Sequence, residues 1–396
     1  MVLPCELIDE VLCRLPVKYL LRFRCVSKGW CSLIDSNAFV KKHLKRALEC
    51  NAGGGSIFIN SGGDKFYLAD LESLDDDEAV AVEIKGSLKT RLSGAVVVGA
   101  ANGLVCVSKN MMNQILVINP STRRWRKIAS APAEFPRCFH STEVSFCGFG
   151  YDDVNDDYKV VKIADCHDRG MMIIVYSLKT NSWKWIQNVP RNVDFCGYWG
   201  MFAGGALHWL ATKDPNASEI VVGFDLALEQ FKEIPYLVVE TPTVPATGVV
   251  SDGGSLWVLE YYPDSHMDMW MMNNHSGMEN ENLWFKALSV EQHFVLGSFS
   301  LLKPVAFSKS GESVLLEVHI SVVDRAELVW YDLKSKTVKN VKIQGIPHNF
   351  ESYAYTESLV QLSKNKLLQR PSLDKPENKH HENRDDVLSK GFKLSL

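Results

Sequence analysis

The chain has 396 residues, which is enough for two or three domains, or for one small module and one large domain. With 46% hydrophobic and 23% charged residues its composition is that of an ordinary globular protein, and its net charge of −4 gives no overall preference for nucleic acid or an anionic membrane. The longest weakly polar run, Gly94 to Val107, is shorter than the about 20 apolar residues that a membrane span needs, so we expect it in a protein core.

Residues 1–30 carry charged side chains throughout and therefore lack the apolar centre of a secretory signal. We expect the protein in the cytoplasm and nucleus. Its ten cysteines lie between Cys5 and Cys196 without a Cys-x-x-Cys pair. We interpret them as reduced, mostly buried thiols rather than a zinc site, and we expect no metal and no cofactor.

Residues 1–48 are predicted to be helical. Pro4 suits a first helical turn, Pro16 separates two helices, and Ser27 and Asn37 are plausible N-caps of the two helices that follow. We expect the last of these helices to pack on the domain that follows it.

The helical segment is unusually apolar, because 19 of the 32 residues from Leu3 to Ile34 are hydrophobic. A helical hairpin of this size has one small interior and cannot cover so many apolar side chains. The remaining apolar surface requires either the rest of the chain or a partner protein.

The sequence changes character after Cys50. Residues 49–56 form a glycine-rich connector, and from 57 to 363 short apolar runs alternate with Gly, Asn, Asp and Ser, which is typical of strands and turns. Residues 364–396 hold eight Lys or Arg and five Asp or Glu with few apolar residues, so we predict a flexible polar tail.

The strand region repeats itself. Each copy is an apolar strand, a polar turn and a second strand that opens with a large apolar residue. The copies are 115–128, 173–186, 220–234 and 328–338, with a variant pair of strands over 269–285. The anchors, spaced by 58, 48, 53 and 54 residues, are Trp125, Trp183, Phe231, Trp284 and Val338. A second apolar element recurs before each copy, at 102–107, 205–210, 254–259 and 313–317.

A period near 50 residues with about four strands per unit is typical of a β-propeller, in which stacked blades bury each other's faces. The alternative is a β-sandwich with ordinary hairpins, which does not explain why the aromatic anchor recurs. We therefore predict an α+β multidomain chain with a small all-α module, an all-β propeller and a tail. Phe66–Val82 and Ser352–Leu362 are expected to close the ring from opposite ends.

The N-terminal segment resembles the F-box over nearly the whole motif. The residues that carry this resemblance are Leu3-Pro4-x-Glu6-Leu7-Ile8-x-Glu10-Val11-Leu12-x-Arg14-Leu15-Pro16 and Leu20-Leu21-Arg22-Phe23-Arg24-Cys25-Val26-Ser27-Lys28-x-Trp30-x-x-Leu33-Ile34. The chain departs from many relatives at Ser27, where they have a cysteine.

The rest of the chain resembles the plant F-box proteins with a kelch-like F-box-associated domain. The resemblance rests on 119–122, 148–152, 157–161 and 330–333. Within that group the chain is similar to the defence-repressing type named for constitutive expression of pathogenesis-related genes, through 224–229, 269–272 and 384–394.

The resemblance implies a non-catalytic, substrate-recognition subunit of a Skp–cullin–F-box (SCF) E3 ubiquitin ligase. Its partners would be a Skp-family adaptor, a cullin held through that adaptor, and a protein substrate such as an intracellular immune receptor. The family's adaptor-facing positions, carried onto this sequence, are Leu3, Pro4, Ile8, Leu15, Pro16, Leu20, Val26 and Trp30. The alternative for each of these residues is packing inside the helical hairpin. For Leu12 and Phe23, which are not among them, we favour that packing.

We expect the substrate to bind loops at one face of the propeller. The candidate loops are Ala131–Thr142, Asp165–Gly170, Pro190–Gly197, Thr241–Thr247 and Tyr262–Glu281. The methionines of Met267–Met272 suit an adaptable binding surface, although a strand in the core explains them better.

Two other functions are weighed against the ligase. The first is catalysis, but the chain has no Walker loop, Gly-x-Ser-x-Gly or His-Glu-x-x-His motif, and Ser300-x-x-Lys303 is too short a pattern to be specific. His140, His167 and His208 show no metal-binding spacing. The second is an F-box interaction protein without ubiquitin transfer, which the sequence leaves open. A nucleic-acid role is disfavoured because the basic tail is interleaved with acids.

Overall fold

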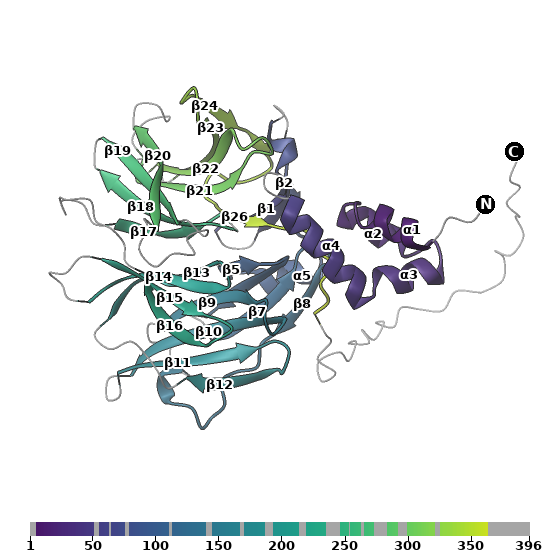
Figure 1. Ribbon diagram of the computed structural model, residues 1–396, viewed down its shortest axis with the longest axis horizontal. Helices are drawn as coiled ribbons and strands as arrows, with labels where there is room; N and C mark the ends of the chain where they lie inside the picture. The colour runs from purple at the N-terminus through teal and green to yellow at the C-terminus, as the bar shows by residue number, and fades with distance from the viewer. Residues whose placement is uncertain are drawn as a thin grey trace, which may run out of the picture. The chain divides into compact units, whose positions relative to one another are not determined.

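The computed structural model describes 5–50, 55–62, 65–75, 79–110, 113–139, 145–166, 170–186, 193–213, 219–234, 246–252, 254–262, 265–272, 283–291, 299–320 and 325–362. Helices come first in the chain and strands follow (Figure 1). The predicted tail, 364–396, lies outside the described residues. Among the residues that are described, no helix has the length and apolar character needed to cross a membrane.

Four helices make up the N-terminal module, as predicted. They are α1 (Cys5–Leu12), α2 (Val17–Phe23), α3 (Lys28–Ile34) and α4 (Asn37–Cys50). Ser27 is confirmed as the N-cap of α3, because its side chain accepts a hydrogen bond from the backbone N–H of Trp30. The cap expected at Asn37 is wrong by one residue: the hydroxyl of Ser36 accepts from the N–H of Phe39, and Asn37 is already the first helical residue.

The strands form a propeller, as the repeat predicts. Four sheets have four strands each, and one eight-stranded sheet consists of two four-stranded meanders, so the described residues make six four-stranded units. A short helix, α5 (Ser87–Leu92), follows the first unit, and two single turns, η1 (Glu72–Asp75) and η2 (Arg137–Phe139), and a small sheet of β3 (Ala79–Val80) and β25 (Ile343–Gln344) lie between strands.

The six units, each given from its first strand to its fourth, have the following bounds. They are β26 (Glu351–Tyr355), β1 (Ser56–Asn60), β2 (Phe66–Asp70) and β4 (Val82–Glu83); β5 (Val96–Ala101), β6 (Leu104–Lys109), β7 (Gln114–Asn119) and β8 (Arg124–Lys127); β9 (Ser145–Asp152), β10 (Asp157–Cys166), β11 (Gly170–Ser177) and β12 (Ser182–Ile186); β13 (Asp194–Ala203), β14 (Ala206–Thr212), β15 (Ile220–Asp225) and β16 (Gln230–Ile234); β17 (Ala246–Ser251), β18 (Leu256–Tyr262), β19 (His266–Met272) and β20 (Trp284–Glu291); and β21 (Leu301–Phe307), β22 (Ser313–Ile320), β23 (Arg325–Asp332) and β24 (Val338–Val341).

The repeat anchors all occupy one structural position. Each is the first or second residue of the fourth strand of its unit, and each belongs to an apolar cluster. The anchors are Trp125, Trp183, Phe231, Trp284 and Val338. The second recurring element is the second strand, as in β6 and β14. The sequence period therefore records one blade.

The ring closes by pairing the two ends of the strand region. β26 pairs along its whole length with β1, and β2 lies on the other side of β1 in the same sheet. The two segments expected to close the ring thus share one unit, although β1 stands between them. Glu317 of β22 binds across this closure, since its carboxylate accepts hydrogen bonds from the backbone N–H and hydroxyl of Ser352 in β26 and forms an ion pair with Lys303 at 3.0 Å.

The tight turns after the first and third strands contain residues whose backbone adopts the left-handed conformation. Arg123, Asn181, Glu229 and Lys336 all have φ between 55° and 58° and stand just before the fourth strand of their units. In the fourth unit Asp225 holds the turn, because its Oδ1 accepts from the N–H groups of two later turn residues. In the third and fourth units the left-handed residue, Asn181 or Glu229, hydrogen-bonds to the preceding unit or to the strand before the turn.

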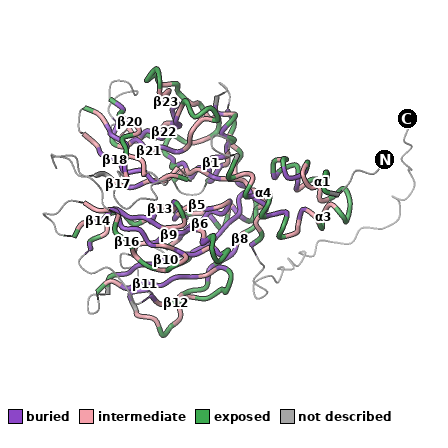
Figure 2. The backbone as a smooth tube through the Cα atoms, in the orientation of Figure 1, coloured by how far each residue is buried: buried purple, intermediate pink, exposed green. Residues whose placement is uncertain are grey.

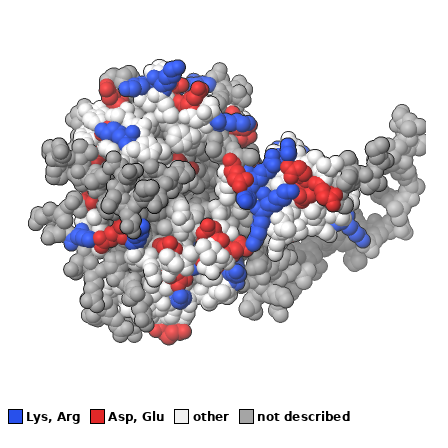
Figure 3. All heavy atoms as spheres, in the orientation of Figure 1, with Lys and Arg blue, Asp and Glu red and all other residues white. Residues whose placement is uncertain are grey.

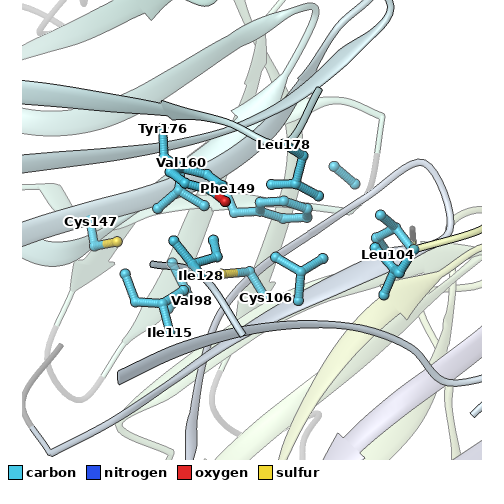
Figure 4. Packing of buried hydrophobic residues seen from close by; sticks show 13 residues of the cluster. Val98, Leu104, Cys106, Ile115, Ile128, Cys147, Phe149, Val160, Tyr176 and Leu178 are labelled. Atoms are coloured by element: carbon cyan, nitrogen blue, oxygen red, sulfur yellow. The ribbon is translucent and has the colours of Figure 1, made fainter. Parts of the chain in front are cut away.

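Apolar clusters fill the spaces between neighbouring units, so the strands are largely buried and the turns exposed (Figure 2). Between the second and third units, Val98, Cys106 and Ile115 face Phe149 and Val160 (Figure 4). Burial of this kind on both faces explains why the strands read as short apolar runs rather than alternating patterns.

Glycines allow the third and fourth units to approach closely. Gly200 of β13 pairs in parallel with Gly148 of β9, and a Cβ atom at Gly200 would lie 2.3 Å from the ring of the fully buried Trp209.

We therefore expect Gly200→Ala to lower the free energy of unfolding by about 1–3 kcal/mol, because the buried indole has no room to move away. Gly248→Ala is the matched control, since Gly248 also lies on a first strand and a Cβ atom added to it would have nothing within 4 Å. Chemical denaturation of both variants checks the prediction, which equal midpoints for Gly200→Ala and wild type would contradict.

Two expectations need correction. The loop expected over Tyr262–Glu281 is interrupted, because residues 266–272 form β19 with Met267 and Met269 buried in its core. The strand-core interpretation of these methionines is confirmed. Cys138 is disulfide-bonded rather than free, which sequence spacing could not indicate because pairing depends on distance in the fold.

Candidate functional site

The interior of the helical module is completed by a residue from the far end of the strand region. Leu12, Leu20, Ile34 and Phe39 are buried in one cluster, and Leu359 packs into the same cluster. The chain itself therefore covers one part of the apolar surface that the sequence predicted to be in excess.

Another part of that apolar surface stays uncovered. Leu7 and Val11, one helical turn apart on α1, are 53% and 59% exposed, Tyr19 is 45% exposed and Val26 is 62% exposed. Around the core lie the half-buried side chains of Ile8, Leu15, Leu21, Phe23, Trp30 and Leu33. We call these exposed and half-buried side chains together the open F-box surface.

The predicted adaptor-facing residues are distributed unequally over this surface. Val26 and Pro16 are exposed, and Ile8, Leu15 and Trp30 are half-buried. Leu20 is fully buried in the helical core, where it supports the surface but is not accessible. Leu3 and Pro4 lie outside the described residues. Leu12 is buried, as expected for core packing, whereas Phe23 is half-buried like Ile8, Leu15 and Trp30.

Sequence reasoning overlooked Leu7, Val11 and Tyr19 as exposed apolar residues. In the sequence, Leu7 and Val11 are named only among the residues that carry the F-box resemblance. Their spacing could have indicated their exposure, because Leu7 and Val11 are one turn apart on one face of α1 and buried Leu12 lies on another face.

Local contacts hold Trp30 in place. Ser27 caps the helix through the N–H of Trp30 at 3.1 Å, and the ring of Phe23 meets the indole edge-on with a centroid distance of 5.6 Å. Arg24 and Asp35, paired at 2.7 Å, join the end of α2 to the end of α3. The indole is thus positioned before any partner arrives.

A buried histidine fixes the turn between α1 and α2. The Nε2–H of His43 on α4 donates to the carbonyl oxygen of Leu15 at 2.9 Å. Burial lowers the pKa of His43 and outweighs the opposing effect of this hydrogen bond, so the ring is neutral at physiological pH. Leu15 and Pro16 are therefore held against α4.

Ion pairs join the acidic face of α1 to the basic face of α4. Lys42 contacts Asp9 and Glu10, and Arg46 contacts Glu10 at 3.3 Å. Figure 3 shows basic side chains gathered over α4 with acidic side chains beside them. The hydrogen bond from Arg14 lowers the pKa of Glu10 most, followed by that from Lys42. Exposed pairs of this kind orient helices but contribute little stability.

One segment, 357–362, joins the helical module to the propeller. The amide of Asn119 in β7 donates to the carbonyl oxygens of Ser358 at 3.0 Å and Val360 at 2.9 Å. The Ser358 hydroxyl donates to the carbonyl of Gly103, where any side chain would collide with Ser358. We call segment 357–362 the joint.

The joint also contacts the helices directly. Leu359 lies in the helical core, and the side-chain amide of Gln361 donates to the carbonyl of Asp35 at 3.3 Å. Lys41 on α4 forms an ion pair with Asp156 in the turn between β9 and β10. The expectation that the last helix contacts the propeller is confirmed, with the joint supplying most of the contact.

Four of the five candidate substrate loops leave one end of the propeller, whereas the fifth, Tyr262–Glu281, includes the connection from β19 to β20, which follows a third strand and leaves the other end. Strands alternate in direction within a unit, so connections after the second and fourth strands share an end, while the tight turns occupy the other end. Four candidate loops are connections after a second or fourth strand: 131–142, 165–170, 190–197 and 241–247. Residues 194–197 are already part of β13, and much of the rest lies outside the described residues.

The turns that meet the joint, β26 or the helical module belong to the other end. Asn102–Gly103, Asn119–Ser121 and Asp156 all lie in turns after a first or third strand. We call the two ends the loop face and the turn face. The loops are therefore presented on the side opposite to the joint.

The residues considered for catalysis have structural contacts. Lys303 pairs with Glu317, and the hydroxyl of Ser300 donates to a backbone carbonyl. His208 is buried, and burial lowers its pKa to about 4. His140 and His167 lie outside the described residues. Within the described ranges no three His, Cys, Asp or Glu residues are grouped as metal ligands.

Comparison with known proteins agrees with this two-part architecture. Residues 2–42 match the F-box domain, and residues 57–366 match the F-box associated beta propeller domain. F-box protein CPR1 of Arabidopsis thaliana is 32% identical, with 100% of this chain and 99% of that protein covered. F-box protein At4g22390 of the same plant is 28% identical over 99% of each chain. The chain therefore belongs to the plant F-box proteins that carry an F-box-associated β-propeller domain.

Proposed function

We propose that this protein is the substrate-recognition subunit of an SCF E3 ubiquitin ligase. The observation that carries the proposal is the open F-box surface, which stays apolar and exposed after Leu359 has completed the helical core. Apolar surface with a pre-positioned tryptophan near its centre is the kind of surface that a partner protein covers. A Skp-family adaptor is the proposed partner, and a cullin is held through it.

In this role the protein performs no bond chemistry itself. Ubiquitin arrives as a thioester on a conjugating enzyme, and the ligase raises the effective concentration of a substrate lysine near it. The joint supports this proposal, because hydrogen bonds and apolar packing connect the adaptor-binding helices to the propeller. The loop face, opposite to the joint, is the proposed substrate face.

The proposed biological setting rests on the resemblance to the defence-repressing type, which the similarity to F-box protein CPR1 supports. We propose that the protein acts in the cytoplasm and nucleus as a negative regulator of plant defence, by directing an intracellular immune receptor to ubiquitination and proteasomal degradation.

Depleting the protein tests this function. The target receptor is expected to accumulate and its ubiquitinated forms to decline, and restoring wild-type protein should reverse both. Unchanged receptor levels and unchanged defence-gene expression would contradict the defence role. Adaptor binding without ubiquitin transfer to any substrate would instead support a non-ligase interaction protein.

A further inference from the structure

The junction between the first and second units contains a cavity of about 520 Å³ with an unusual charge. Three cationic side chains line it, those of Lys65, Lys85 and Arg123. The carboxylate that also lines it, Glu83, already has a partner, because Lys89 donates to it at 2.7 Å. The cavity therefore carries an excess of positive charge.

The same turn position at two other junctions carries a hydrogen-bond acceptor, and the comparison shows how the described residues of this junction differ. The left-handed turn residue of the third unit, Asn181, accepts a hydrogen bond from Arg126 of the second unit. Its counterpart in the fourth unit, Glu229, accepts from Lys159 and Lys184 of the third unit. At both junctions the turn residue supplies an acceptor to cations of the preceding unit.

Arg123 occupies the same turn position in the second unit but is itself a cation. Across the junction it meets the cavity wall that carries Lys65 and Lys85. Both lysines lie close enough to Glu83 to help lower its pKa, after the larger effect of the Lys89 hydrogen bond. Within the described part of the chain, no ion pair is formed by Arg123, Lys65 or Lys85. Three like charges beside a single carboxylate that Lys89 already pairs disfavour the empty state.

The rest of the cavity wall is mostly apolar and ranges from buried Tyr67 to exposed Val82. Tyr67, Ala81 and Val82 line it, and Val82 is 60% exposed. Val82 belongs to β4, an edge strand of only two residues. The site thus offers an arginine fork and two ammonium groups beside an exposed apolar edge.

We propose that this cavity binds a phosphorylated side chain in an otherwise apolar segment of a partner protein. The phosphate supplies a dianion where the described residues offer only the already paired Glu83, Arg123 binds it through its planar fork, and Lys65 and Lys85 neutralise the remaining charge. The neighbouring apolar residue of the segment covers Val82. Arg123 lies in the turn after a third strand, β7, and therefore on the turn face, so this contact is separate from the substrate loops of the loop face. Identifying the partner as a ligase substrate that makes this second contact rests on the proposed function.

The test uses the purified full chain and fluorescence anisotropy of labelled model peptides. The peptides are a phosphothreonine flanked by leucines, the same peptide with threonine, and the same peptide with two glutamates in place of phosphothreonine. We expect wild type to bind the phosphopeptide most tightly. Arg123→Asn should weaken this binding about tenfold or more, and asparagine suits the left-handed turn, so the fold is preserved.

Lys336→Asn is the matched control, since it removes a cation from the corresponding turn of the sixth unit and should leave phosphopeptide affinity unchanged. Equal affinity of wild type and Arg123→Asn, equal binding of the phosphorylated and unphosphorylated peptides, or a preference for the diglutamate peptide would each overturn the proposal. Adaptor binding is measured on the same samples. If adaptor binding is retained while phosphopeptide binding fails, the cavity proposal is wrong and the proposed function still stands. If wild type does not bind the adaptor, the proposed function is wrong, whatever the phosphopeptide result.

Discussion

Glu317→Ala is expected to lower the free energy of unfolding of the propeller by about 3–5 kcal/mol. The carboxylate is fully buried, binds Lys303 and His319 and accepts two hydrogen bonds from Ser352, so its removal leaves the half-buried ammonium of Lys303 and the buried backbone N–H of Ser352 without their acceptor. Because Ser352 lies in β26, this loss falls on the strand that closes the ring. Chemical denaturation of the purified protein measures it.

Glu72→Ala provides a matched control at the same junction. Glu72 pairs with Lys309 between the same two units, but both side chains are largely exposed, so the loss should stay below about 1 kcal/mol. Similar losses for the two variants would show that the Glu317 contacts do not hold the ring closed.

The Glu317 contribution also has a defined pH dependence. Burial alone would raise the pKa of this carboxyl, but the charge of Lys303 and the hydrogen bonds from His319 and Ser352 lower it to about 2. Because the pKa of Glu317 is lower in the folded state than in the unfolded state, its ionised carboxylate stabilises the fold. This stabilisation is fully present above the unfolded-state pKa of about 4.5 and is lost as the pH falls toward 2. The stability difference between wild type and Glu317→Gln should therefore shrink over that range.

Asn119→Ala is expected to loosen the joint, and the turn between β7 and β8 that the same side chain holds through the N–H of Thr122, while leaving strands far from the joint intact. Its buried amide donates to Ser358 and Val360, and its carbonyl accepts from Tyr355. Leaving two buried carbonyl oxygens unpaired should cost about 3 kcal/mol, and this cost falls on segment 357–362. Because Leu359 then leaves the helical core more often, backbone amides of α3 and α4 should exchange at least about tenfold faster.

Hydrogen exchange measured by mass spectrometry separates the joint from the propeller. Strands far from the joint, such as β18 and β22, should keep their wild-type exchange. Asn340→Ala, an exposed asparagine on β24, is the matched control and should change neither region. Unaltered exchange of α4 in Asn119→Ala would mean that the joint does not hold the helices.

A loosened joint has a consequence for the proposed ligase. Substrate lysine and thioester would be held in a wider range of positions, so ubiquitin transfer should slow while adaptor binding stays unchanged. Substrate presentation and adaptor binding are thus separable properties of this chain.

The blade repeat could be predicted from sequence because its signals are local. A large apolar residue opens each fourth strand, from Trp125 to Val338, and a polar turn precedes it. The number of units could not be predicted in the same way. The closing unit takes β26 from one end of the strand region and β1 from the other, and its fourth strand, Val82–Glu83, has no anchor.

The candidate site was predictable only in part. The apolar excess of the helices and the F-box resemblance both indicated a partner surface, and Val26 is exposed as expected. Leu20 is buried instead, since it lies one turn from buried Val17 on the inner face of α2. Contacts such as Leu359 with the helices, or Asn119 with Ser358, join residues more than 200 positions apart, and no local pattern encodes them.

Binding of a Skp-family adaptor tests the central claim most directly. We predict that purified wild-type protein forms a stable complex with the adaptor in size-exclusion chromatography and calorimetry. A Val11→Asp, Val26→Asp double variant should bind at least about a hundredfold more weakly, because its carboxylates would be buried without partners, and it should remain folded because both positions are exposed. Val154→Asp, an exposed valine of the propeller, should bind like wild type. No complex with wild type, or equal binding by the double variant, would contradict the assignment of the open F-box surface as the adaptor site.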